Sequence, residues 1–268
     1  METIQPIIGE AAAVAETGTQ RLLLIADIHA GYEIAARYEE GLEIPTRAHL
    51  RRERLLRLVT ETSPDRLIIL GDLTHSIGKP GRIESEEIAE LLEPIQCPIT
   101  VVKGNHDGIL EELLKEDPER FENMTVTKAS GEVYESLGVL HGHTWPDETV
   151  LQSDVLCIGH EHPTVRLQDE VGGFQTKRVW LRGPLSLDAF PFDLPADTHP
   201  PELILFPAFN ELSGGTWVND PEQGFLSPFL PAALPEGIVY LLDGTELGEY
   251  RNIPVHQDRG SGLNNLSS

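Results

Sequence analysis

Short runs of apolar residues recur along the chain, and polar or charged residues separate them. Several runs have the length and the leucine or β-branched content of buried strands. They are RLLLIAD, DRLIILGD, ITVVKGN, LGVLHG, DVLCIGH, RVWL, ELILFP and GIVYLLDG. The pattern therefore predicts a protein with many short strands.

Three segments have helical spacing instead. Residues 46–62 place leucines at positions 50, 55, 56 and 58. Residues 84–95 begin with acidic side chains, which the helix dipole favours at that end, and residues 109–115 form a shorter third segment. Strand and helix alternate as far as about residue 115, and strands dominate afterwards. This order predicts an α/β sandwich in which two mixed sheets pack together.

The length of 268 residues suits a single domain, which we place at residues 1–250. Within it, residues 189–235 are rich in proline and aromatic residues and are expected to form long loops over the core. Asp243-Gly244 between apolar runs predicts a hairpin that closes the domain. Residues 251–268 have little to bury, and we expect a disordered tail.

The charge is strongly acidic. The chain has 44 acidic and 20 basic residues, for a net charge of −24, and 40% of its residues are hydrophobic. This excess argues against a generally basic nucleic-acid surface and favours solubility. Acidic, lysine-poor chains are typical of salt-rich cytoplasm, where screening weakens self-repulsion, although an acidic protein from an ordinary mesophile is the alternative.

The chain begins METIQPIIGE, without a secretory signal pattern, and no apolar run reaches the length of a membrane span. We therefore expect a soluble cytoplasmic protein. Cys97 and Cys157 each lie in a strand-like run, which predicts buried free thiols in place of a disulfide or zinc framework.

Polar side chains stand where five predicted strands end. In open α/β sheets, the carboxyl ends of strands are where sites form. The residues are Asp27 and His29, then Asp72, then Asn105, His106 and Asp107, then His141, and finally His160 and His162. Carboxylate, amide and imidazole without thiolate suit Mn²⁺, Fe or Zn²⁺, and so many ligands favour two metals that share one carboxylate.

The ordered motifs D-x-H, G-D, G-N-H-D, H-G and G-H-x-H resemble those of the calcineurin-like binuclear metallophosphoesterase superfamily, over roughly residues 20–185. The segments GYE, Thr74-His75-Ser76 and PAFNELSGGTWVN are similar to an archaeal and bacterial branch of it, the DNA-ligase-associated phosphoesterases, which are Mn-dependent DNA endonucleases. The resemblance implies a four-layer αββα sandwich of two mixed sheets flanked by helices. It also implies two divalent metals, with Mn²⁺ favoured over Fe, Zn²⁺ or Ni²⁺.

The resemblance further implies a role for each residue. Asp27, His29 and His162 would hold one metal, Asp72 would bridge, and Asn105, His141 and His160 would hold the second. His106 would remain unliganded and act on the scissile phosphate, Asp107 would orient it, and Gly104 would allow the tight turn. A hydroxide bridging the metals would attack a phosphodiester.

Three functions follow from these expectations. A DNA phosphodiesterase or nuclease, with DNA-repair proteins as partners, is the first. The second is a phosphatase or phosphodiesterase acting on a small nucleotide-like molecule, and the third is a metal-free interaction scaffold. A basic track around the cleft would favour the nuclease, whereas a closed pocket roofed by residues 189–235 would favour a small substrate.

Other polar residues receive more modest expectations. His143 is expected either to support the ligands or, as we favour, to point away from the site, and His75 either to touch substrate or to face solvent. Surface histidines are predicted at 49, 199 and 256. The arginines of the first predicted helix, at positions 51, 52, 54 and 57, form either a phosphate-binding patch or, as we favour, ion pairs with acidic residues, and the glutamates at 84, 86, 87 and 90 form a solvated helix face.

Overall fold

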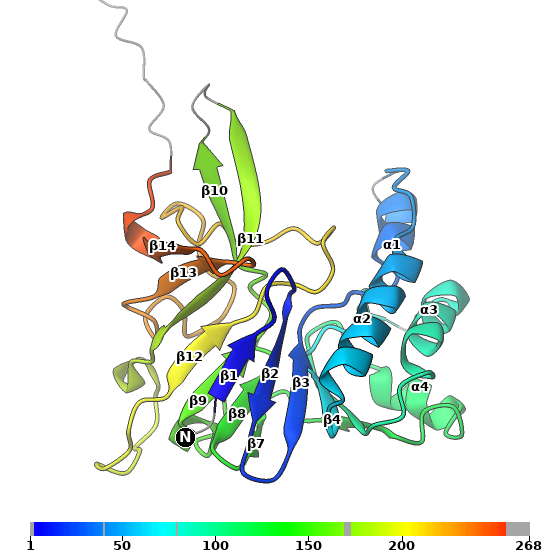
Figure 1. Ribbon diagram of the computed structural model, residues 1–268, viewed down its shortest axis with the longest axis horizontal. Helices are drawn as coiled ribbons and strands as arrows, with labels where there is room; N and C mark the ends of the chain where they lie inside the picture. The colour runs from blue at the N-terminus through cyan, green and yellow to red at the C-terminus, as the bar shows by residue number, and fades with distance from the viewer. Residues whose placement is uncertain (1–2, 40, 79, 169–172, 256–268) are drawn as a thin grey trace, which may run out of the picture.

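The computed structural model describes residues 3–39, 41–78, 80–168 and 173–255, and these form a sandwich of two sheets (Figure 1). The six-stranded first sheet has the order β1 (Thr3–Pro6), β2 (Ala12–Glu16), β3 (Arg21–Ile25), β4 (Arg66–Ile69), β5 (Ile99–Val102) and β6 (Met124–Thr127). The eight-stranded second sheet has the order β14 (Glu246–Glu249), β13 (Ile238–Leu241), β11 (Phe174–Pro184), β12 (Glu202–Leu205), β9 (Val155–Ile158), β8 (Leu137–Leu140) and β7 (Glu132–Tyr134), and β10 (Thr164–Gln168) pairs with β11.

The described helices are α1 (Tyr32–Glu39), α2 (Ala48–Thr62), α3 (Arg82–Leu92) and α4 (Leu110–Glu116). They connect the parallel strands β3 to β6 and lie on one side of the first sheet (Figure 1). The sequence predicted α2, α3 and α4 but missed α1, which mixes charged and apolar residues over only eight positions. It also missed β2, whose sequence AAVAE is rich in alanine, a residue depleted in strands.

Three buried clusters hold the layers together. In β3, Leu23 and Ile25 face the helices, while Leu22 and Leu24 face the second sheet, so both faces of the strand are buried. The cluster between the sheets also contains Trp180. The predicted sandwich of two mixed sheets is confirmed. In the described residues, however, loops and short 3₁₀ turns cover the outer face of the second sheet in place of helices, as the burial of Phe190, Phe229 and Tyr250 there shows.

The loops agree with the prediction from the sequence, whereas the start of the C-terminal segment does not. Loops do occupy most of residues 189–235, with β12 among them, and β13 and β14 form the predicted hairpin. The expected disordered tail is wrong at its start, because Tyr250–Asn252 form a 3₁₀ turn and Ile253 packs into the second-sheet cluster. Residues 256–268, with His256, lie outside the described residues.

Most of the predictions for the cysteines and the surface histidines are confirmed. Cys97 and Cys157 are both free, and Cys157 is buried between the sheets, which raises the pKa of its thiol. Cys97 is only half-buried, so the prediction of a buried thiol is wrong there. His49 and His199 are exposed, as predicted. No helix in the described residues is long and apolar enough to cross a membrane.

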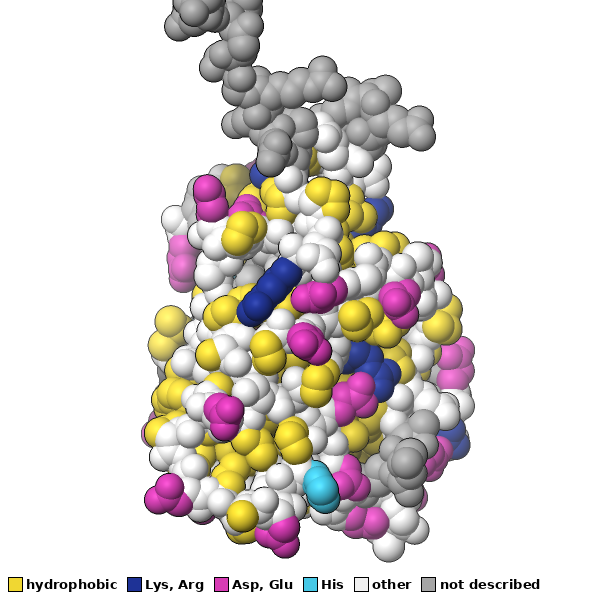
Figure 2. Space-filling view, turned by 90° about the vertical axis from the view of Figure 1, so that its left-hand side faces the viewer, with side chains coloured by type: hydrophobic (Ala, Val, Ile, Leu, Met, Phe, Trp, Pro, Cys, Tyr) yellow, Lys and Arg dark blue, Asp and Glu magenta, His cyan; other side chains and the backbone are white. Residues whose placement is uncertain are grey.

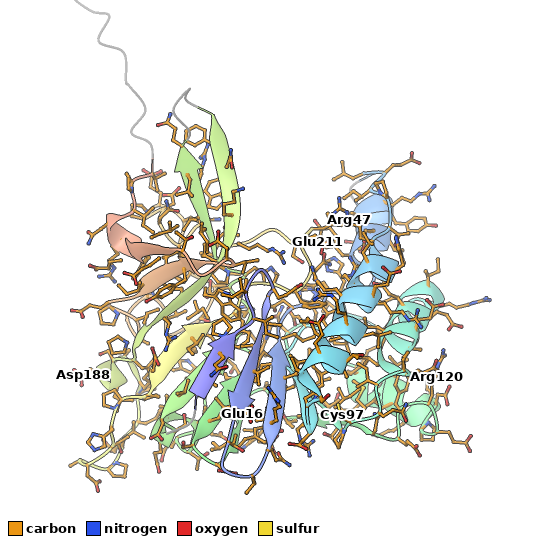
Figure 3. The ribbon with its side chains drawn as sticks, in the orientation of Figure 1. Glu16, Arg47, Cys97, Arg120, Asp188 and Glu211 are labelled. Atoms are coloured by element: carbon orange, nitrogen blue, oxygen red, sulfur yellow. The ribbon has the colours of Figure 1, made fainter. Side chains whose placement is uncertain are left out.

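Ion pairs occupy three of the four arginines of α2, while Arg52 donates to the Glu90 carbonyl. Arg51 is 1% exposed and donates to both Glu33 oxygens at 2.8 and 2.9 Å and to Glu87 at 2.7 Å. Arg57 pairs with Glu10 and Glu61. Near the same helix, Arg47 lies beside Glu211 at 3.4 Å (Figure 3). The favoured interpretation, ion pairs in place of a phosphate patch, is therefore the one that the structure shows.

The glutamates of α3 do not form a uniformly solvated face. Glu84 is buried and accepts hydrogen bonds from the backbone N–H groups of His75 and Ser76. Glu87 accepts from Gly31 N–H at 3.0 Å as well as from Arg51. The prediction is wrong for these two residues because the loops after β3 and β4 pass directly over the helix.

Elsewhere acidic groups are spread over the surface, and on the face in Figure 2 the basic side chains stand singly among them.

We expect Arg51→Ala to lower the free energy of unfolding by about 3–5 kcal/mol, because it leaves two largely buried carboxylates without their cation. Urea denaturation followed by circular dichroism measures this change. Arg52→Ala is the matched control, since Arg52 is exposed and binds only the Glu90 carbonyl, and it should change stability by less than about 1 kcal/mol. Equal unfolding midpoints for the two variants would contradict the assignment.

Candidate metal centre

The predicted strand-end residues meet at the seam between the sheets. Asp27 and His29 follow β3, Asp72 follows β4, and Asn105 and His106 follow β5, all on the first sheet. From the second sheet, His141 follows β8, and His160 and His162 follow β9. Backbone contacts join the two sets, since the His160 N–H donates to the Asp27 carboxylate at 3.1 Å. The carboxyl ends of parallel strands in both sheets thus converge on one place.

Six of these side chains form two clusters, each with its ligand atoms within 4.8 Å of one another. One contains Asp27, His29 and His162, and the other contains Asp72, His141 and His160. Asp72 also reaches the first cluster, because its Oδ2 lies 3.7 Å from His29 Nε2 and 3.4 Å from His141 Nε2. The grouping is the one that the resemblance implied.

Asn105 and His106 complete the arrangement. Asn105 Oδ1 lies 3.1 Å from His141 Nε2, beside the second cluster. The His106 backbone N–H donates to Asp72 Oδ1 at 2.9 Å, and its ring Nε2 lies 4.0 Å from Asp72 Oδ2. The His106 side chain is 22% exposed, so its ring stands at the solvent edge of the clusters.

Carbonyl oxygens fix the orientation of the rings. His141 Nδ1–H donates to the Leu70 carbonyl at 2.7 Å, and His162 Nδ1–H donates to the Gly214 carbonyl at 2.7 Å. Because a carbonyl can only accept, both rings turn Nε2 toward the carboxylates. Outer hydrogen bonds of this kind hold imidazole ligands in place in metal sites.

The backbone is strained at the same positions. Seven non-glycine residues in the described chain have positive φ, and five of them are members of the clusters: Asp27, His29, Asp72, His160 and His162, with φ from 43° to 68°. Such a conformation costs roughly 1–3 kcal/mol per residue and gathers at functional sites. The strain therefore marks these loops independently of their side-chain chemistry.

Two glycines make room for the clusters. A Cβ at Gly71 would overlap the His141 ring, and a Cβ at Gly104 would overlap Asp72 Oδ1. Gly71 also has a φ of +84°, which favours glycine. Gly104 does not have a positive φ, but its carbonyl accepts from the Asp107 N–H at 3.3 Å, so it does begin the predicted tight turn. It also lets the β5 loop approach Asp72.

The titration behaviour reflects burial and mutual charge. Burial, followed by the charge of His162, lowers the pKa of His29 to about 3, and burial, followed by the charge of His141, lowers that of His160 to about 4. Burial also acts to lower the pKa of His141, but the charge of Asp72 and its hydrogen bond outweigh burial and raise it to about 9. The pKa of Asp72 lies below its usual value because His141 outweighs burial.

Asp107 does not orient His106, contrary to the prediction. Its buried carboxylate accepts from the backbone N–H groups of Thr74 and Gly104 at 3.1 and 2.9 Å, whereas the His106 Nδ1–H donates to the His75 carbonyl. Burial, followed by the charge of Asp72, raises the pKa of Asp107 to about 6. Asp107 therefore ties the β4 loop to the β5 loop.

Two further histidines lie closer to the clusters than the sequence suggested. His75 Nδ1 lies 3.4 Å from His29 Nδ1, and the His75 ring stacks on that of His106 at 5.5 Å. Together with His29 and His106 it forms a third potential metal-binding group. The His143 ring centre lies 5.2 Å from that of His141, so the expectation that it points away is wrong.

Two buried residues that support the metal-binding loops were not predicted from the sequence. Glu161 is fully buried between the two histidines of G-H-E-H and accepts from Leu226 N–H, Ser227 N–H and the Thr216 hydroxyl. Asn210 is also fully buried, and its N–H donates to the Asp27 carbonyl. An acid between two histidines, and an asparagine in the quoted PAFNELSGG segment, were the available signals.

The donor set fits a pair of divalent metals. Two carboxylates, of Asp27 and Asp72, and four imidazoles are buried or partly buried together, and the amide oxygen comes from the exposed residue Asn105. Neutral His29 and His160 offer free lone pairs, and the mixed oxygen and nitrogen donors suit first-row transition metals.

Comparisons with known proteins agree with this geometry. A family model described as calcineurin-like phosphoesterase matches residues 20–222. Among solved structures, the crystal structure of Pseudomonas putida nuclease MPE matches with a TM-score of 0.50 and 21% identity, covering 90% of this chain and 98% of that chain. At this identity, the structural match supports the fold alone. No curated protein matches the chain.

We expect Mn²⁺ binding to the metal-free protein to release about one proton from His141 near pH 7.5, because a pKa of about 9 keeps that ring protonated and a metal must displace the proton. Apparent affinity should therefore rise with pH up to about 9. Calorimetry in buffers of different ionisation enthalpy measures the proton count. His141→Ala should lower the proton count, with the remainder coming from His162, whose pKa is also raised, and exposed His199→Ala should leave the count unchanged. Buffer-independent heats would refute the expectation.

Proposed function

The chain belongs to the calcineurin-like phosphoesterase family, and from this premise we propose that it is a nuclease that cleaves phosphodiester bonds in DNA. The family depends on two metals, so the protein is a metal-dependent hydrolase. The observation that carries the proposal is the position of Asp72 between two three-residue clusters. One carboxylate can serve both clusters only if two metals lie side by side.

We assign the residues as the resemblance implied. Asp27, His29 and His162 hold one metal, Asn105, His141 and His160 hold the other, and Asp72 serves both. Bound there, the metals, with Mn²⁺ as our choice, would activate water and neutralise charge on the phosphate oxygens. Because Asp72 accepts the His106 backbone N–H, the position of the carboxylate and that of the His106 ring are coupled.

His106 is assigned the substrate-facing role. Its Nδ1–H donates to a carbonyl, which leaves Nε2 directed toward the solvent edge beside Asp72. When Nε2 is protonated as well, a ring in this position can donate to a phosphate oxygen or protonate the leaving oxygen. Stacking against His75 keeps the ring in that orientation.

Three features favour a DNA substrate. The structural neighbour is named a nuclease, the loop motifs resemble the ligase-associated branch, and His162 and His106 remain 16% and 22% exposed, which a polymer strand can reach. The acidic surface fits a salt-rich cytoplasm, where screening weakens its repulsion of DNA. We therefore also propose a cytoplasmic protein with one domain at residues 1–250 and a role in DNA repair.

Purified protein with Mn²⁺ in high KCl should nick circular single-stranded DNA and convert it to the linear form. Asp72→Ala should produce no linear DNA, because it removes the carboxylate that serves both clusters. Gel electrophoresis of the DNA is the measurement. If bis-p-nitrophenyl phosphate is hydrolysed but DNA is untouched, the metal chemistry stands and the nuclease assignment fails in favour of a small phosphodiester.

His106→Ala should lower kcat by about 10²-fold or more while both metals stay bound, as is usual when a proton-transferring or charge-stabilising group is lost. The two measurements are ester hydrolysis and metal content by mass spectrometry. Exposed His49→Ala is the control and should leave both unchanged. Loss of metal from His106→Ala would show that His106 is a ligand.

A further inference from the structure

The hairpin of β10 and β11 carries a cation packed between two aromatic rings. The Arg166 guanidinium lies 4.0 Å from the ring centre of Phe174 and 4.8 Å from that of Trp217. Phe174 is 43% exposed. These three residues, here named the Arg166 platform, come from β10, β11 and the loop after β12.

The platform differs from the arginine sites that form ion pairs. Arg47, Arg51, Arg54, Arg57, Arg120 and Arg182 each pair with a glutamate. Among the described residues, no carboxylate pairs with Arg166 within 4 Å. Segment 164–178 contains three basic and two acidic residues, in a chain with 20 basic and 44 acidic. The hairpin is thus locally more basic than the chain as a whole.

The platform is tied to the metal centre. β10 begins two residues after His162, so Arg166 Cα lies at most about 14 Å from that of His162. Trp217 follows Gly214, whose carbonyl accepts from the His162 ring, and a Cβ at Gly215 would overlap the His162 carbonyl. Asn219 fixes the Arg166 backbone with two hydrogen bonds of 3.1 and 3.0 Å. The platform therefore has a defined position beside one end of the site.

We propose that the Arg166 platform stacks the unpaired bases of a DNA strand whose phosphate lies at the metal centre. Aromatic faces and an arginine plane are what single-stranded nucleic acids bind, with little dependence on sequence. A cation that pairs with no carboxylate of the described residues also attracts the phosphate backbone to a protein whose charge otherwise repels it. The inference rests on the proposed nuclease function and adds a base-stacking site for the substrate strand.

The strand register supplies a matched control. Arg166 pairs with Thr176 and Gln168 pairs with Phe174, so Arg166 and Phe174 lie on one face of the hairpin. Lys177 pairs with Val165 and lies on the opposite face. Lys177→Ala therefore removes one positive charge from the same hairpin and leaves the platform intact.

The test compares kcat/KM of the Mn²⁺-loaded enzyme for a fluorescent oligothymidylate and for bis-p-nitrophenyl phosphate, which has no nucleobases to stack. The ratio of the two values should fall about tenfold for Arg166→Ala and Phe174→Ala. The ratio should fall almost as far for Arg166→Lys, because lysine keeps the positive charge but lacks the planar guanidinium that can stack on a base. Lys177→Ala should retain the ratio of the wild type.

The outcomes separate the two claims. Wild-type enzyme that hydrolyses the ester but not DNA overturns both the nuclease function and the platform. Wild-type enzyme that cuts DNA, with the same ratio in Phe174→Ala and Arg166→Lys, overturns the platform alone. An equal loss in Lys177→Ala would also overturn it, since general attraction would then explain the binding.

Discussion

The arrangement depends on placing the Asp72 carboxylate, only 2% exposed, at the seam of two sheets. Its Oδ2 faces both His29 and His141, and its Oδ1 accepts the His106 N–H. This approach requires Gly104, whose position leaves no room for a side chain, and Gly71 on the other flank. Because Asp72 touches groups from both sheets, the site exists only when the sandwich has closed.

Burying this many polar groups is costly unless their charges are balanced. Burial and the charge of Asp72 both act to raise the pKa of Asp27, but the histidines outweigh them, and the pKa values of both carboxylates lie below their usual range. In the metal-free protein His141 compensates by staying protonated. Two divalent ions bound there would provide a stronger balance and displace that proton, so the electrostatics of this cluster favour metal binding.

Much of the fold and the cluster could be predicted from the sequence because short apolar runs end in polar residues, and strand ends of parallel sheets meet. The ligand candidates needed only that rule and the resemblance. Glu84 and Asp107 could not be interpreted correctly in the same way. Their partners are backbone N–H groups of loops distant in sequence, and no side-chain pattern records where a loop will pass. For this reason, the sequence predicted that the acidic residues at the start of α3 would face solvent.

The left-handed backbone at Asp27, His29, Asp72, His160 and His162 limits what evolution can place there. Aspartate, asparagine, histidine and glycine tolerate that conformation better than most residues, and two of these are also the preferred ligands. A descendant protein that no longer bound metals would still need residues that tolerate this backbone conformation. It would therefore keep the same residue types at these positions. Sequence motifs alone would then identify inactive descendants as enzymes. A substitution of Gly71 or Gly104 by a residue with a side chain would be the more reliable sign of lost activity, because the ligands need the space at those positions.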